Sequence, residues 1–297
     1  MSARQPAVRP LWMEKPSGFV QTLKVLVIAM IVLVMLYPVI AVVLQSFASA
    51  DAALSGDLIP KSFSTSAYRI ILSGGVVTRS LLITAGLTIV GTFLSMLFTT
   101  TMAYGLCRVR DVPFAKAALM LVIGTMFFGA GIIPMYLMVQ WLGLLNTYWA
   151  LILPGLIGAF NLIVVRNFFM NLPQDVFEAA RIDGAGEIRI FFSLVLPLSK
   201  AVLAVIALFY AVGYWNTFFS GMLYLDDSAM WPIQVVLNQY VVQGAPLGTL
   251  QNPNMPPAPS EAVRAAVVVL ATLPILIVYP FLQRFFTKGV LTGAIKG

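Results

Sequence analysis

Five long stretches of this 297-residue chain carry no charged side chain. They span residues 25–50, 80–107, 117–165, 201–225 and 265–283. A helix needs about 20 apolar residues to cross roughly 30 Å of hydrocarbon, so each of the four shorter stretches suits one crossing. The chain is 60% hydrophobic and only 10% charged, which is too little charge to cover a water-soluble surface of this size. The sequence therefore predicts an all-α integral membrane protein.

The stretch 117–165 is 49 residues long, which is too long for a single crossing. A turn signal lies in its middle, at residues 143–147, and Trp141, Tyr148 and Trp149 surround it. Aromatic side chains of this kind gather at the membrane–water interface. The stretch therefore predicts two helices joined by a short hairpin, which brings the number of expected spans to six.

The basic residues favour one orientation of these spans. An even number of spans places both termini on one side, and that side holds 14 of the 18 Lys and Arg residues. Counting acids as well, the two faces carry +8 and −1, the pattern of a positively charged cytoplasmic face. We expect a cytoplasmic tail at 1–24, a six-helix membrane domain at 25–286 and a cytoplasmic tail at 287–297. The distribution of basic residues is then explained by the orientation of the chain in the membrane, and no nucleic-acid partner is expected.

Several kinds of chemistry are missing from the chain. It has no histidine and one cysteine, Cys107, which excludes histidine-based catalysis, disulfides within the chain and the common zinc sites. No Gly-Lys pair occurs, so no phosphate-binding loop of the ATPase type is present. The spans hold no charged residue away from their ends, which disfavours ion-coupled transport. We predict no catalytic residue and no metal site, and any energy would come from another subunit.

The segment 171–200 is polar and long for a connection between membrane helices. A helix is predicted to start near Pro173 and to end at Gly184, since glycine commonly terminates helices. A second short helix is expected over 186–194, stopping before Pro197. Two interpretations remain open at this point. The segment either lies at the membrane interface as a helix–turn–helix, or it docks into a partner and transmits its motion.

The sequence EAARIDGA at 178–185, with Leu196-Pro197-Leu198 downstream, resembles the EAA motif of permease subunits of ABC importers. The six-span layout, with the motif between spans four and five, is similar to the type I importer fold. The resemblance implies that this segment is a coupling helix seated in a groove of a cytoplasmic ATPase. The implied coupling residues are Glu178, Ala179, Ala180, Asp183, Gly184 and Ala185.

Other segments resemble the maltose-type carbohydrate-uptake permeases. These are Tyr214-Trp215-Asn216 in the fifth span and the C-terminal residues 283–297. Tyr224, Trp231-Pro232 and Gln234 are similar to a subgroup that serves oligosaccharides, including fragments of alginate or rhamnogalacturonan. The resemblance implies import of a sugar or oligosaccharide by a non-catalytic subunit.

The same resemblance implies a set of partners in the bacterial inner membrane. They are a second homologous permease, two ATPase subunits that bind ATP and Mg, and an extracytoplasmic solute-binding protein. Three alternatives stay open on the residues alone. The solute could be a peptide, a polyamine or an anion, the chain could be a stand-alone carrier or channel, or it could be a scaffold without transport activity.

A sugar offers hydroxyl groups, so a path for it needs hydrogen-bonding and aromatic side chains. Polar residues within spans also bond neighbouring helices, and aromatic residues also anchor at the interface. Both interpretations apply to each candidate path residue: Tyr136, Gln140, Asn161, Tyr214, Trp215, Asn216 and Thr217.

Three further expectations concern single residues and one loop. Asp183 is expected to cap the second short helix, and Glu178 is expected to pair with a nearby basic group such as Arg181. The Pro-rich segment 246–259 is expected to be an irregular external loop.

Overall fold

The computed structural model describes residues 17–49, 52, 59–72, 75–107, 112–242 and 261–294. Within these ranges the chain is almost entirely helical, and no strand occurs beyond one isolated antiparallel bridge between Ala48 and Phe63. The Pro-rich segment 246–259 and the first 16 residues of the predicted N-terminal tail lie outside the described residues. The predicted all-α class is confirmed.

Among the described residues, three helices are long and apolar enough to cross a membrane by themselves. They are α1 (Gly18–Ser46), α4 (Val76–Cys107) and the portion Glu261–Val278 of α15 (Glu261–Ala294). Two bent pairs raise the number to as many as five. One pair joins α7 (Trp149–Ile152) and η2 (Leu153–Gly155) to α8 (Ala159–Met170) with a bend of 49°.

The other bent pair joins the short helices of residues 187–198 to α12 (Lys200–Trp215) with a bend of 83°. After α12 the chain breaks at residues 216–218 and continues as α13 (Phe219–Tyr224), η4 (Ser228–Met230), α14 (Ile233–Leu237) and the π-helical η5 (Asn238–Val242). The predicted fifth span, 201–225, is thus interrupted near its end. α15 is helical to Ala294, across most of the predicted C-terminal tail.

The predicted third span is divided as well. α5 (Ala115–Phe127) ends 13 residues after it begins, and α6 (Ile132–Trp141) starts after a break at 128–131. The break contains Gly129 and Gly131, and the φ of Gly131 is +81°, a left-handed conformation that a helix cannot include. The predicted hairpin at 143–147 is confirmed, and Gly143 and Asn146 both have positive φ there.

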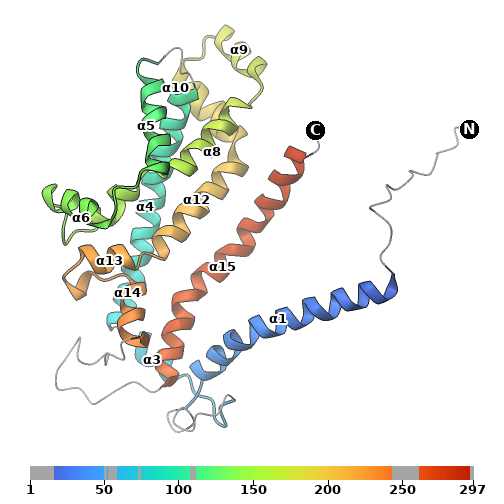
Figure 1. Ribbon diagram of the computed structural model, residues 1–297, viewed down its shortest axis with the longest axis vertical. Helices are drawn as coiled ribbons and strands as arrows, with labels where there is room; N and C mark the ends of the chain where they lie inside the picture. The colour runs from blue at the N-terminus through green and yellow to red at the C-terminus, as the bar shows by residue number, and fades with distance from the viewer. Residues whose placement is uncertain are drawn as a thin grey trace, which may run out of the picture.

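The core of the bundle is α4, which packs on α12 and α8 (Figure 1). Hydroxyl groups join α4 to α12: Ser95 Oγ lies 2.9 Å from the Tyr214 hydroxyl, and Thr99 Oγ1 lies 2.7 Å from the Tyr210 hydroxyl. The Tyr210 hydroxyl also accepts a hydrogen bond from the backbone N–H of Gly158, at the start of α8. One tyrosine therefore connects three helices in an otherwise apolar interior.

Replacing Tyr210 with phenylalanine is expected to destabilise the bundle by about 1–2 kcal/mol. The change keeps the ring but removes both hydrogen bonds and leaves the Gly158 N–H unpaired. Thermal unfolding of the purified protein in detergent measures the effect. Tyr37→Phe is the matched control, because Tyr37 is exposed on α1, and its thermal stability should equal that of the wild type.

A second core lies at the opposite end of the bundle from α9 (Gln174–Ile182) and α10 (Glu187–Ile190). It joins α3 (Ser66–Leu72), the start of α4, α14 and the start of α15. Figure 1 shows these elements at one end of the molecule and α9 and α10 at the other. Trp215 belongs to this second core and donates from Nε1 to the carbonyl oxygen of Ala271 at 2.8 Å.

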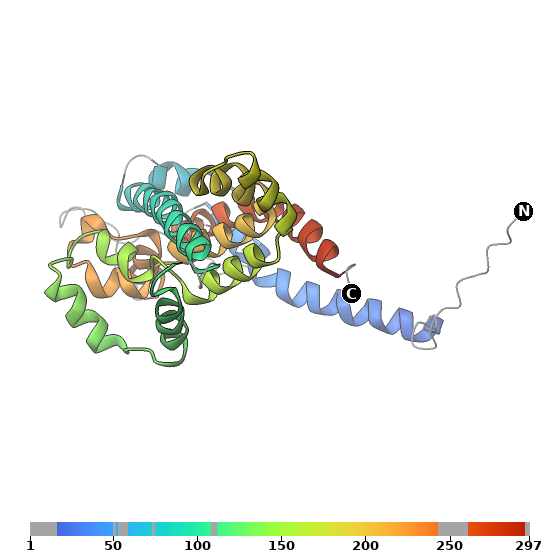
Figure 2. The same ribbon diagram turned by 90° about the horizontal axis from the view of Figure 1, so that it is seen from above.

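α1 packs on α15, and its last residue, Ser46, contacts Tyr68 of α3 through hydroxyl groups 2.7 Å apart. Its side chains from residue 18 to residue 40 are all exposed and mostly apolar. Figures 1 and 2 agree that α1 extends away from the bundle. Such a surface suits lipid or other membrane helices and is unsuited to water.

Candidate functional site: the loop between α8 and α12

The polar segment between α8 and α12 begins with an amphipathic helix, α9 (Gln174–Ile182). Pro173 occupies its N-cap position and Asp175 lies in its first turn, where a negative charge favours the helix dipole. Phe177 on one face is 6% exposed, whereas Ile182 on another is 86% exposed. The predicted helix start is confirmed, and the helix has one face buried against the bundle and one face outside it.

α9 ends in a Schellman turn. Gly184 has a φ of +79°, its N–H bonds to the Arg181 carbonyl at 3.0 Å, and the N–H of Ala185 bonds to the Ala180 carbonyl at 2.9 Å. This pair of bonds satisfies carbonyl groups that the helix end would leave unpaired. The predicted role of Gly184 as helix terminator is confirmed.

The second half of the segment is one continuous helical stretch. It consists of α10 (Glu187–Ile190), the π-helical η3 (Phe191–Val195) and α11 (Leu196–Leu198). The prediction that it stops before Pro197 was wrong. Proline clashes with the carbonyl four residues earlier in a regular α-helix, and the wider π turn just before Pro197 is where such a clash is relieved.

Buried side chains seat this loop on the bundle. Phe177 comes from α9, and Ile190, Phe191 and Val195 come from the second stretch; all four belong to the main core. Ala180 and Ala185 are half-buried and also pack on that core. Of the six predicted coupling residues, these two face inward, while the other four, Glu178, Ala179, Asp183 and Gly184, are exposed.

The outer side of the loop exposes apolar side chains next to polar ones. Ile182 is 86% exposed and adjoins the exposed Asp183 in sequence, and Ile188 is 77% exposed and follows the exposed Glu187. Whether this surface contacts a partner stays a prediction. The motif at 178–185 lies at the end of α9 and in the Schellman turn that follows it.

Two expectations about charged residues were wrong. Arg181 pairs with Glu187, with 3.6 Å between Nε and Oε1, and not with Glu178. Asp183 does not cap the second helix, because Gly186 occupies the N-cap position of α10 and no side chain bonds there. The sharp turn at Gly184 brings the first residue of α10 back toward the end of α9, which makes Glu187 the nearer partner.

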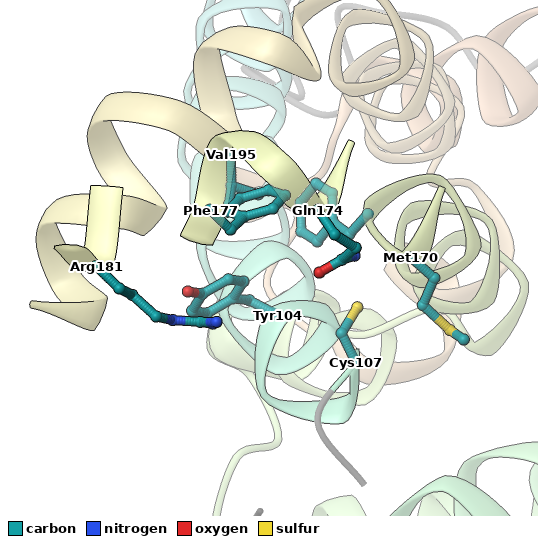
Figure 3. Close-up of a pocket in the computed structure, with 8 residues that line it drawn as sticks. Tyr104, Cys107, Met170, Gln174, Phe177, Arg181 and Val195 are labelled. Carbon is teal, nitrogen blue, oxygen red and sulfur yellow. The ribbon is translucent and has the colours of Figure 1, made fainter. Parts of the chain in front are cut away.

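A cavity of about 190 Å³ lies beneath the loop (Figure 3). In Figure 3 the Arg181 side chain extends toward the hydroxyl end of Tyr104, and Phe177 lies beside Val195. The cavity is lined by Tyr104, Cys107, Phe169, Met170, Gln174, Phe177, Arg181 and Val195. Among the described residues, no group of His, Cys, Asp or Glu could hold a metal ion here or elsewhere.

The predicted path residues lie in two different surroundings. Tyr214 is buried against α4, where its ring lies over Gly91, and Trp215 is buried against α15. Both therefore contribute to helix packing. The half-buried Tyr136 stacks on Tyr224 with 6.2 Å between ring centroids, and Gln140 lies exposed on the same helix, α6.

Of the other three candidates, two bond locally and one lies on α8. Asn216 Nδ2 donates to the Val212 carbonyl and Thr217 Oγ1 to the Gly213 carbonyl, both one turn earlier. Asn161 is half-buried on α8. The structure does not gather all seven residues at one place, and the assignment to a solute path stays a prediction.

Sequence reasoning named Gln234 but not the group of polar and aromatic residues around it. A hollow of about 240 Å³ between the break at 216–218, α14 with η5, and α15 contains the amides Gln234 and Asn238, one helical turn apart, beside the ring of Phe218. Its other lining residues are Leu237, Val241 and Val268. The spacing of the two amides was visible in the sequence, but the ring comes from a different element, so only the fold reveals the group.

Several membrane-length helices, with a polar helical loop between α8 and α12, define a multi-pass membrane protein. The sequence matches the family described as "Binding-protein-dependent transport system inner membrane component" over residues 19–292. The chain therefore belongs to this family of transporter permeases, and the predicted importer-permease fold is confirmed.

Relatives and a solved structure agree with this assignment. The polygalacturonan/rhamnogalacturonan transport system permease protein YtcP of Bacillus subtilis is 47% identical over 90% of this chain and 95% of its own length. Protein LplC of the same species is 47% identical over 88% and 89%. A crystal structure of a bacterial ABC transporter involved in importing the acidic polysaccharide alginate contains a chain with a TM-score of 0.83 and 30% identity, over 92% of this chain and 98% of that one.

Proposed function

We propose that this chain is one of two permease subunits of an ATP-driven importer for oligosaccharides, including fragments of acidic polysaccharides. The observation that carries the proposal is the EAA segment, held as a rigid turn with exposed isoleucines on a bundle of membrane helices. The substrate class rests on the relatives, one named for polygalacturonan and rhamnogalacturonan and one solved with an alginate importer.

The chain has no ATPase motif of its own, so the chemistry belongs to partners. Two cytoplasmic ATPase subunits would bind ATP and Mg, and a solute-binding protein would deliver the substrate on the other side. The α9 turn would seat in one ATPase through Glu178, Ala179 and Ile182. Closure of the ATPases would then move the turn as a rigid body and shift the bundle between two states.

The proposed orientation places the α9 turn and both termini in the cytoplasm. It is supported by the charge difference between the two faces, +8 against −1. The α14 end of the bundle then faces the solute-binding protein. Because the described spans carry charged residues only near their ends, an acidic oligosaccharide would be received by neutral donors such as Gln140, Asn161 and Asn216, or by the second permease.

Reconstitution of the whole transporter tests this function. The four membrane and ATPase subunits are placed in liposomes together with the solute-binding protein and a labelled oligogalacturonate. We expect uptake that requires ATP and the binding protein, and ATP hydrolysis that the loaded binding protein stimulates. Uptake that persists without the ATPase subunits would contradict the proposal, as would uptake of peptides or polyamines in place of any oligosaccharide.

A further inference from the structure

We infer that Glu187 is a positioning residue that holds the loop between α8 and α12 against the end of α4, so that the loop and α4 move as one rigid unit. The inference rests on the proposed function and adds how movement of the loop is passed to the membrane helices. Glu187 is the first residue of α10 and lies two residues beyond the EAA motif at 178–185. The role inferred for it is to hold the loop in place and not to contact an ATPase.

One carboxylate joins three elements. The Tyr104 hydroxyl, on α4, donates to Glu187 Oε2 at 2.6 Å. The other oxygen, Oε1, lies 3.6 Å from Nε of Arg181, in the last turn of α9. Hydrogen bonds that involve a charged group are shorter and stronger than neutral ones, and they are directional. Glu187 therefore fixes α9 and α10 to each other and both to α4.

The Tyr104 ring is itself held in place. Its centroid lies 5.1 Å from that of Phe191, and the Phe191 ring meets Phe192 edge-on at 5.0 Å. Phe191 is buried in the main core. The hydroxyl that donates to Glu187 thus has a fixed position, which is what a latch between two elements requires.

The buried side chains of the loop do not fill all of the space between the loop and the bundle. The cavity of about 190 Å³ lies between α9 and the end of α4, and Tyr104 and Arg181 both line it (Figure 3). A loop next to unfilled volume loses little contact by leaning into it, since side chains that border a void have no partner atoms there. The contacts of Glu187 with Tyr104 and Arg181 lie beside this cavity, where the loop is least packed.

α4 then connects the loop to the far end of the bundle. With 32 residues, α4 is about 48 Å long at 1.5 Å per residue. Near its other end, the Thr84 hydroxyl accepts a hydrogen bond of 2.8 Å from the backbone N–H of Ile233, the first residue of α14. Movement of the loop therefore reaches α14, at the end where the solute-binding protein is proposed to dock.

The test is the number of ATP molecules hydrolysed per substrate imported by the reconstituted transporter. Glu187→Gln and Tyr104→Phe should each raise this ratio by about threefold or more, because the ATPases still close while the loop slips relative to α4. The double variant should be no worse than Glu187→Gln, since both changes break one linkage. Glu261→Gln, which weakens an exposed ion pair with Arg264 at the opposite end, is the matched control and should leave the ratio unchanged.

Cys107 offers a second readout, because it is the only cysteine of the chain and lines the cavity. In a transporter whose other subunits lack cysteine, Glu187→Gln should increase the rate of Cys107 labelling by a thiol reagent by about threefold. A fall of uptake and hydrolysis in proportion, with unchanged labelling, would overturn the locking role. If the wild-type transporter itself fails to import oligosaccharide, the proposed function is wrong instead.

Discussion

Replacing Gly184 with proline should reduce import by at least about tenfold while the protein still inserts into the membrane. Gly184 has a φ of +79°, and proline fixes φ near −65°. Proline also lacks the N–H that bonds to the Arg181 carbonyl at 3.0 Å. The Schellman turn cannot form. α9 then loses its defined end, and the EAA segment loses its rigid shape. ATP-dependent uptake in liposomes, together with the yield of assembled transporter, measures the effect.

Graded substitutions separate backbone conformation from side-chain size at this turn. Gly184→Ala adds one methyl group where nothing lies within 4 Å, yet it should cost about 1–2 kcal/mol because of the positive φ. Gly186→Ala is the matched control, with open space as well but a φ of −70°, and it should import normally. Equal activity of Gly184→Pro and the wild type would show that the turn is not needed for coupling.

The sequence alone predicts those features that depend on local chemistry or on the solvent. Charge-free stretches locate helices because lipid tolerates no unpaired charge, and the glycine at 184 ends α9 because few other residues adopt its φ. The six coupling residues are assigned from a contiguous motif; the structure places three of them in α9 and three at its end and in the turn that follows, and their coupling role stays a prediction. Local signals of this kind need no knowledge of the rest of the fold.

Features that depend on distant residues were not predictable in this way. The partner of Arg181 was expected on its own helix, but the turn at Gly184 brings Glu187 closer, and Tyr104, some 80 residues earlier in the chain, completes the contact. Tyr214 and Trp215 suggested a solute path, yet each also bonds a neighbouring helix. Hydroxyl and indole groups can bond a neighbouring helix or bind a solute. Residue type does not distinguish these two uses; only the neighbours of each group in the fold do.

Replacing Gly91 with alanine should destabilise the bundle by about 2 kcal/mol, enough to lower the apparent Tm in detergent by about 5 °C. A Cβ atom at this position on α4 would lie 2.7 Å from Cζ of Tyr214, closer than real Cβ contacts occur. The ring cannot move aside easily, because it is buried and its hydroxyl is bonded to Ser95 at 2.9 Å. α4 and α12 would have to move apart. This removes the close approach that small residues permit between membrane helices.

The same helix supplies matched controls for this prediction. Gly86 and Gly105 also lie within α4, and a Cβ at either would meet nothing within 4 Å. Alanine there should leave the Tm unchanged or raise it slightly, since alanine favours a helix over glycine by up to about 1 kcal/mol. Shortening the opposing side chain with Tyr214→Leu should recover part of the stability lost in Gly91→Ala, because the two positions are in contact. Equal Tm values for Gly91→Ala and Gly86→Ala would contradict the close packing of α4 on α12, and with it the rigid connection from the loop to α14.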